Sequence, residues 1–201
     1  MILKILRTHF AMMASILSVG AVAVAQITPI KNFADITIAN FGQMDERYYR
    51  GAQPAPDEYA SLKALGINTV VDLRNDPTDY ERPAVEALGM KYVNIPMSGW
   101  KTPKMEDINA FLTLLDDPAT GTVYVHCKAG RHRASVAGAA YRYTKYDWNY
   151  DQVYKEMKDF RYSSGLVHGA LGSFVKKWGK RREAEREQNA KLAAAGAQLS
   201  N

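Results

Sequence analysis

Residues 125–134 read V-H-C-K-A-G-R-H-R-A, and the strongest structural signal in the chain is centred on them. The preceding residues 122–125 (T-V-Y-V) are β-branched and aromatic, which predicts a buried strand. From Ala134 to Tyr143, small and apolar residues recur at helical spacing, which predicts a closely packed helix. A strand, a tight loop and a helix therefore follow one another directly. Cys127, the only cysteine of the chain, lies where the strand ends.

The residues of this loop suit nucleophilic attack on a bound anion. A thiol attacks as the thiolate, and a helix N-terminus beside cations lowers a thiol pKa from ~8.5 to roughly 3.5–7.5. Backbone N–H groups of a loop that runs into a helix form a concave anion site, and Gly130 tolerates a positive φ or a close approach. The planar guanidinium of Arg133 can hold two phosphate oxygens. We therefore expect Cys127 to attack phosphorus while Arg133 and the loop amides hold the other oxygens.

The pattern H-C-x-x-G-x-x-R at residues 126–133 resembles the signature of the cysteine-dependent phosphatases, specifically the dual-specificity type. Two upstream blocks are similar to the opening of small microbial and plant members. They are R-Y-Y-R-G-A-Q-P at residues 47–54 and L-K-A-L-G-I-N-T-V-V-D-L-R at residues 62–74. The resemblance covers roughly residues 43–178.

The resemblance implies a hydrolase that cleaves phosphate esters through a phosphocysteine intermediate, and it implies no metal or organic cofactor. Cys127 is then the nucleophile, and Arg133 binds phosphate and stabilises the transition state. The other loop residues are expected to bind the substrate: His126, Lys128, Ala129, Gly130, Arg131 and His132. Of these, His126 is also expected to orient the loop.

Three of these residues add two or three cations, depending on the histidine, to a loop that needs only Arg133 for one phosphate. Lys128, Arg131 and His132 therefore favour a polyanionic substrate, such as an inositol phosphate or a phospholipid headgroup. The alternative is a phosphotyrosine protein, with the extra cations keeping the thiolate charged. Two further alternatives are a phosphate-binding module with little turnover and a sulfur-transfer enzyme.

The sequence departs from the family pattern directly after the loop arginine. Family members usually have Ser or Thr there, and the hydroxyl helps the cysteine to leave when water breaks the intermediate. Ala134 stands at this position, and Ser135 lies about 100° further round the helix. By its position Ser135 is no direct equivalent of the missing hydroxyl, and the alternative is that Ser135 or water already serves.

The general acid is a second departure. The family usually supplies an aspartate from the loop after the third strand, but no acidic residue lies between Tyr92 and Lys104. Asp107 is the first candidate and Asp76 the second. The alternative for both is an ordinary carboxylate at a helix start or a turn.

The positive charge of the chain is concentrated at its ends. Residues 1–25 contribute +2 and residues 176–201 contribute +4 to the net charge of +5, which leaves −1 for residues 26–175. A near-neutral body argues against a nucleic-acid partner.

Residues 1–25 have the pattern of a secretory signal peptide. Lys4 and Arg7 precede an apolar run from Ala11 to Ala25 that ends in A-V-A. The run is shorter than the ~20 residues that span a bilayer. We expect cleavage before Gln26 and a secreted or periplasmic protein.

The remaining chain divides into an extended lead-in (26–42), a phosphatase domain (43–178) and a charged, Ala-rich tail (179–201). The tail is expected to be a solvated helix, in preference to a contact between residues 176–182 and anionic lipid. His168 is expected to have a structural role in an apolar helix.

Strands alternate with helices through the domain, which predicts an α/β fold with a mainly parallel sheet covered by helices on both faces. The expected strands are residues 48–50, 69–73, 92–95 and 122–125. The expected helices are residues 57–65, 82–88, 103–115, 134–143, 149–160 and 166–178.

Overall fold

The computed structural model describes residues 33–165 and 167–199. The expected signal peptide, residues 1–25, lies outside the described residues. Within them, five strands form one sheet in the order β1-β2-β5-β3-β4. The strands are β1 (Gly42–Gln43), β2 (Tyr48–Ala52), β3 (Thr69–Arg74), β4 (Lys91–Met97) and β5 (Val123–Cys127). All neighbouring pairs are parallel except β1 and β2, so the predicted mainly parallel sheet is confirmed.

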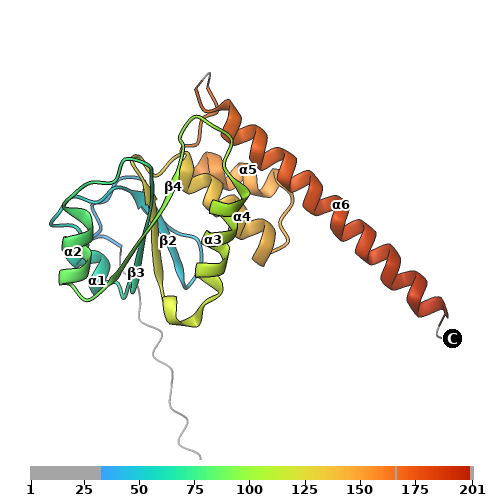
Figure 1. The fold of residues 1–201 in the computed structure, drawn as a ribbon, viewed down its shortest axis with the longest axis horizontal. Helices are drawn as coiled ribbons and strands as arrows, with labels where there is room; N and C mark the ends of the chain where they lie inside the picture. Colours follow the sequence, from blue (N-terminus) through green and yellow to red (C-terminus); the bar gives the residue numbers. More distant parts are fainter. Residues whose placement is uncertain (1–32, 166, 200–201) are drawn as a thin grey trace, which may run out of the picture. The chain divides into compact units, whose positions relative to one another are not determined.

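Helices cover both faces of the sheet, as Figure 1 shows. Two short helices pack on one face: α1 (Tyr59–Ala64) and α2 (Glu81–Ala87). The other face is covered by α3 (Met105–Asp116), α4 (Arg133–Lys145), α5 (Tyr150–Asp159) and α6 (Gly169–Leu199), and a 3₁₀ turn, η1 (Pro118–Thr120), precedes β5. The predicted α/β class is therefore confirmed.

The strand β5 and the helix α4 form the centre of the molecule. All five residues of β5 are buried, as expected for a parallel strand covered on both faces. The first eight residues of α4 are buried too, because its alanines and Gly138 let neighbouring elements approach closely. A Cβ added at Gly138 would lie only 3.3 Å from Nη1 of Arg50 on β2.

The segments that precede and follow the sheet in sequence pack more extensively against the core than the sequence suggested. Phe33, Ile36 and Phe41, in the expected lead-in, pack against the core on the α1–α2 face. The expected tail continues α6 as one helix, whose Leu171, Val175 and Trp178 are buried.

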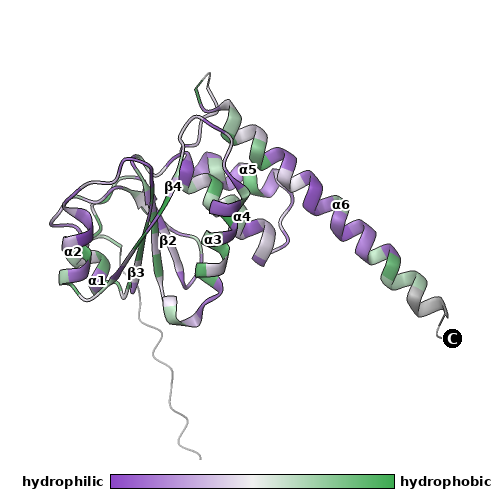
Figure 2. Cartoon of the chain, in the orientation of Figure 1, coloured by the Kyte–Doolittle hydropathy of each residue, from purple (hydrophilic) through white to green (hydrophobic). Residues whose placement is uncertain are grey.

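The helix α6 continues into solvent, where residues 187–195 are exposed. Its middle is mainly hydrophilic, and hydrophobic residues return toward its end (Figure 2), where Leu192 is 63% exposed. No helix of the described part combines the length and the apolar character that a membrane span requires.

Candidate active site

Cys127 is the last residue of β5, and α4 begins six residues later at Arg133. Gly130 has a φ of +65°, and a Cβ there would lie 2.4 Å from the carbonyl carbon of Gly51. Only glycine therefore fits this position, because any side chain would collide with the backbone of β2. The loop is closed tightly against the end of the neighbouring strand.

The carbonyl of Gly130 is tied to residues outside the loop. It accepts hydrogen bonds from Nδ2 of Asn40 at 2.9 Å and from Nη2 of Arg50 at 2.8 Å. Asn40 adopts a left-handed conformation (φ 56°) and also donates to the carbonyl of Phe160 at 3.0 Å. Asn40 thus links the loop peptide to the residue that follows α5.

Two more loop carbonyls are held in the same way. The carbonyl of Lys128 accepts from the backbone N–H of Gln53 at 3.3 Å, and that of Arg131 accepts from Oγ of Ser135 at 2.6 Å. The C=O and N–H groups of a peptide unit point in opposite directions. Carbonyls that point away from the cleft therefore leave the next N–H groups free to converge on an anion.

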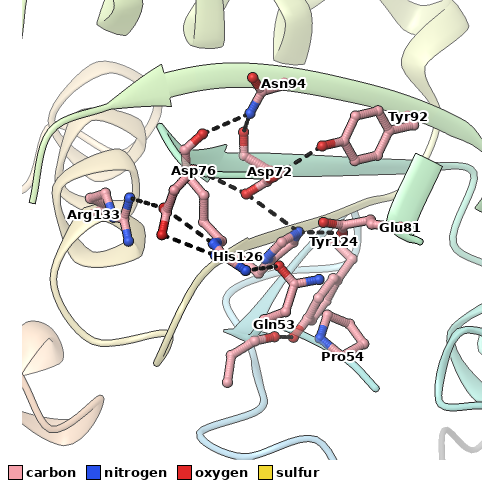
Figure 3. Close-up of polar contacts among 12 residues, drawn as sticks. Gln53, Pro54, Asp72, Asp76, Glu81, Tyr92, Asn94, Tyr124, His126 and Arg133 are labelled. Carbon is pink, nitrogen blue, oxygen red and sulfur yellow. Dashed lines mark hydrogen bonds and ion pairs between the residues drawn. The ribbon is translucent and has the colours of Figure 1, made fainter. Parts of the chain in front are cut away.

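Arg133 is nearly buried and is fixed by groups at the carboxyl end of β3 and β4. Its Nη1 donates to Oδ1 of Asn75 at 3.0 Å and to the carbonyl of Met97 at 3.4 Å. Oδ1 of Asp76 lies 3.7 Å from the same nitrogen, and Figure 3 shows this pair. The guanidinium is therefore positioned before any phosphate arrives.

Asp76 lines the cleft, whereas Asp107 does not. Asp76 is paired with Arg74 at 3.1 Å, and its hydrogen bond from Arg74 is the main reason that its pKa is lowered. Asp107 belongs to the first turn of α3. The structure thus favours the second candidate for the general acid over the first, and it holds that candidate as a carboxylate.

The cleft has a volume of about 470 Å³ and brings together most of the predicted site residues. Its lining residues are Asn75, Asp76, Gly99, Trp100, Cys127, Lys128, Ala129, His132, Arg133 and His168. Arg131 is exposed beside it, and His126 and Gly130 are buried behind it.

One wall of the cleft is a stack of aromatic rings. The ring of His168 stacks on that of His132, with centroids 3.5 Å apart, and on that of Trp100, with centroids 5.8 Å apart. Nδ1 of His168 also lies 2.8 Å from the carbonyl oxygen of Gly99. Burial, and then repulsion from His168, lowers the pKa of His132 to about 4. His132 is therefore neutral at pH 7 and does not supply the cation expected from the sequence.

His126 is fully buried between two carboxylates. Its Nε2 lies 2.7 Å from Oε1 of Glu81 on α2 and 3.9 Å from Oδ1 of Asp72 on β3 (Figure 3). These three side chains have the ligand types of a metal site, with their ligand atoms within 4.8 Å of one another. The short distance from Nε2 to Oε1 pairs His126 directly with Glu81, which suits the predicted role of His126 in orienting the loop.

Ala134 is fully buried at the start of α4, and Ser135 is engaged elsewhere. Oγ of Ser135 donates to the carbonyl of Arg131 and accepts from Nη2 of Arg50 at 2.9 Å. Both of its main hydrogen-bonding capacities are thus used away from Cys127.

Several contributors to the site carried no signal in the sequence analysis. Asn40 and Arg50 hold the loop from behind, and Trp100 and His168 form the cleft wall. His168 was expected inside an apolar helix, but α6 begins one residue later, at Gly169. Glu81 shows no signal in the sequence, because only its full burial beside His126 marks it as part of the site.

Several known proteins with similar sequences or similar folds are phosphatases. The chain is 27% identical over 139 residues to the dual specificity protein phosphatase TpbA of Pseudomonas aeruginosa, covering 65% of this chain and 62% of TpbA. It is 28% identical over 146 residues to inositol diphosphatase DSP2 of Oryza sativa, covering 69% of this chain and 71% of DSP2. The fold is similar to the core catalytic domain of the PP-IP phosphatase SIW14 from S. cerevisiae, with a TM-score of 0.63 at 19% identity. That likeness covers 77% of this chain and 94% of that domain.

The family model described as DSP-PTPase phosphatase fused to NAD+ kinase matches residues 20–170. This match covers well over half of the chain. The protein therefore belongs to this DSP-PTPase family and is a cysteine-dependent phosphatase of the dual-specificity type.

Proposed function

We propose that this protein is an exported phosphomonoesterase that uses Cys127 as its nucleophile and acts on polyanionic phosphate esters. The observation that carries the proposal is that Cys127, Arg133 and the loop residues Lys128 and Ala129 line one cleft, with the guanidinium of Arg133 already held in place. The thiolate forms an S–P bond while the P–O bond to the leaving group breaks. Water then attacks phosphorus, the S–P bond breaks, and inorganic phosphate leaves with the thiolate restored.

Two cations at the cleft support a polyanionic substrate. Lys128 lines the cleft, and Arg131 is exposed beside it. Neither side chain takes part in an ion pair between described residues, so both are available to further phosphate groups. The similarity to a plant inositol diphosphatase points in the same direction.

The aromatic wall favours a second candidate, a phosphotyrosine protein. Trp100 is 63% exposed, although it lines the cleft that contains Cys127. Aromatic pairs contribute about 0.5–1.5 kcal/mol beyond their area burial, so a phosphotyrosine ring gains from stacking here.

The two candidates are separated by comparing an inositol polyphosphate with a phosphotyrosine peptide on the purified protein, with Cys127→Ser as the inactive control. The proposal expects a higher kcat/KM for the polyphosphate and a steep loss of it with added salt. Lys128→Gln and Arg131→Gln should each lower this value while affecting the peptide little. A higher kcat/KM for the peptide at physiological salt, lost in Trp100→Ala, would contradict the polyanionic substrate and support the phosphoprotein.

Export is tested separately, because it rests on the first 25 residues alone. Mass spectrometry of the exported protein should show Gln26 at its N-terminus. A chain that retains Met1 and stays with the membrane fraction would contradict this part of the proposal.

A further inference from the structure

Arg50 is a buried arginine for which the described residues provide no carboxylate partner. It lies on β2 and is 1% exposed. The other buried arginines, Arg74, Arg133 and Arg142, each have a carboxylate oxygen within 4 Å. No such ion pair with Arg50 occurs among residues 33–165 and 167–199. Charged groups are rarely buried without a counter-charge, so this position requires an explanation.

The surroundings of Arg50 hold its guanidinium firmly. Nη2 donates to the carbonyl of Gly130 at 2.8 Å and to Oγ of Ser135 at 2.9 Å. The guanidinium carbon lies 4.0 Å from the ring centroid of Phe160, in cation–π geometry. Gly138 provides the space, since a Cβ there would lie 3.3 Å from Nη1. The phosphate-binding loop, α4 and Phe160 thus enclose one cation.

The sheet register places Arg50 near Cys127. Arg50 lies two residues before Ala52 on β2, and Ala52 pairs with Cys127 on β5, so the side chains of Arg50 and Cys127 lie on the same face of the sheet. Burial lowers the pKa of Arg50, and the groups that oppose this shift are, in order, Tyr48, Cys127, Glu156 and Tyr124. Burial raises the pKa of both phenols, which are therefore neutral at pH 7. Glu156 is already paired with Arg142 at 2.6 Å. The thiolate of Cys127 is the remaining anion.

We propose that Arg50 is a positioning residue of this phosphatase: its buried charge balances the Cys127 thiolate, and its hydrogen bonds hold the Gly130 peptide with the next N–H directed toward the phosphate. Arg50 acts from behind the loop and does not touch the substrate. This inference rests on the proposed phosphocysteine mechanism. It adds a second arginine to the one within the loop, supplied by β2, which is distant in sequence but pairs with β5.

Other titratable or charged groups also face Cys127, and substitutions at Arg50 leave them in place. Those sharing its cleft are Asp76, Lys128, His132, Arg133 and His168, and Tyr124 interacts with it electrostatically from the same strand.

The test measures the alkylation of Cys127 by iodoacetamide as a function of pH in the full-length chain. Since Cys127 is the only cysteine, the reaction reports on one site. Arg50→Met removes the charge and keeps a long side chain against Phe160. Arg50→Lys keeps the charge and loses the paired hydrogen bonds. Arg142→Met is the matched control, because it removes a buried arginine that is paired elsewhere with Glu156.

In Arg50→Met we expect the pH midpoint of alkylation to move up by about one unit, as for the loss of a nearby opposite charge. We expect kcat/KM for an aryl phosphate to fall about 10- to 100-fold. Arg50→Lys should keep the wild-type midpoint of alkylation but have a lower kcat/KM. Ser135→Ala should also keep the midpoint, with a smaller decrease in kcat/KM. Thermal unfolding of every variant separates these effects from a loss of folding.

The inference is overturned if Arg50→Met and Arg142→Met share the wild-type midpoint and the same kcat/KM. If Arg50→Met does not fold, Arg50→Lys decides, because wild-type kcat/KM in that variant would contradict the positioning role. A wild-type protein that releases no phosphate from any ester would refute the proposed function. A midpoint shift in Arg50→Met would still support the link between Arg50 and the thiolate.

Discussion

The Nε2 atom of His126 lies 2.7 Å from Oε1 of Glu81, and both side chains are fully buried. His126 immediately precedes the nucleophile. Glu81 begins α2, which packs on the face of the sheet opposite α4. Burial raises the pKa of Glu81, but its interactions with His126, Gln53 and Tyr59 together outweigh burial, so the net shift is downward. For Asp72, burial prevails and the pKa is raised. Glu81 is therefore the carboxylate that is paired with His126.

We expect Glu81→Gln to lower the free energy of unfolding at pH 7 by about 3 kcal/mol, because it removes one partner of a buried pair. A lowered folded-state pKa makes the contribution of Glu81 complete above about pH 4.5, its ordinary value. The contribution is lost as the pH falls through the lower, folded value. Urea unfolding at pH 7 and at acidic pH should show that the difference in free energy of unfolding between wild type and variant becomes smaller at acidic pH. Glu86→Gln, on the exposed side of the same helix, is the control, and an equal loss there would contradict the prediction.

We expect Ala134→Ser to raise the steady rate of turnover. Attack by Cys127 requires only groups that are in place, but expulsion of its thiolate lacks the neighbouring hydroxyl, and Ser135 is engaged with Arg50 and Arg131. A hydrogen bond to a charged group contributes ~1.5–3 kcal/mol, or roughly a 10- to 150-fold change in rate. Rapid mixing with an activated aryl phosphate should show a burst in the wild type that shrinks in the variant. A wild type without a burst, together with an unchanged steady rate in Ala134→Ser, would contradict this mechanism.

At acidic pH, where part of Asp76 carries a proton, we expect Asp76→Asn to slow the hydrolysis of alkyl phosphates and to spare activated aryl phosphates, since only the alkyl esters need a proton on the leaving oxygen. The pKa of Asp76 is lowered from its ordinary value of 3.8, so its acidic form is lost as the pH rises through a still lower value. The preference for aryl over alkyl esters should therefore narrow as the medium becomes more acidic. Rates for an ester series with different leaving groups measure this directly. Asp107→Asn serves as the comparison, and a selective loss on alkyl esters in that variant would restore it as the acid.

We expect the stability of the protein to fall as the pH is lowered from about 6.5 to about 4, in part through His132. The folded state keeps this imidazole neutral, with a pKa of about 4, whereas the unfolded chain protonates it near 6.5. The unfolded state therefore binds the additional proton in this range and is favoured. His132→Phe should flatten the dependence of Tm on pH between these values while keeping a ring in the stack. An unchanged slope in the variant would show that His132 does not contribute to it.

The sequence was sufficient for the features that depend on neighbouring residues. The order of strand, loop and helix around Cys127, the parallel sheet and the glycine at position 130 all follow from local pattern. Asp107 was preferred because it lies near the loop after the third strand in sequence. The structure places it in α3 and outside the cleft lining, while Asp76 follows the neighbouring strand and reaches the cleft.

The parts of the site that could not be predicted depend on contacts between distant residues. Asn40 and Arg50 reach Gly130 across 90 and 80 positions, and His168 reaches Gly99 across 69. No spacing rule connects such residues. Arg50 looked like one polar residue in a short strand, and its importance appears only when its burial and its missing carboxylate are known.

The two hydrogen bonds of Asn40 also have a consequence for how the protein folds. This one side chain joins carbonyls that lie 90 and 120 positions later in the chain. Contacts of such long range require the largest loss of chain entropy, so we expect them to form after the local strands and helices. A folding intermediate with its secondary structure complete would then still lack the anion cradle. Inorganic phosphate would accordingly be a selective ligand of the fully folded chain, and would slow its unfolding without speeding the early steps of folding.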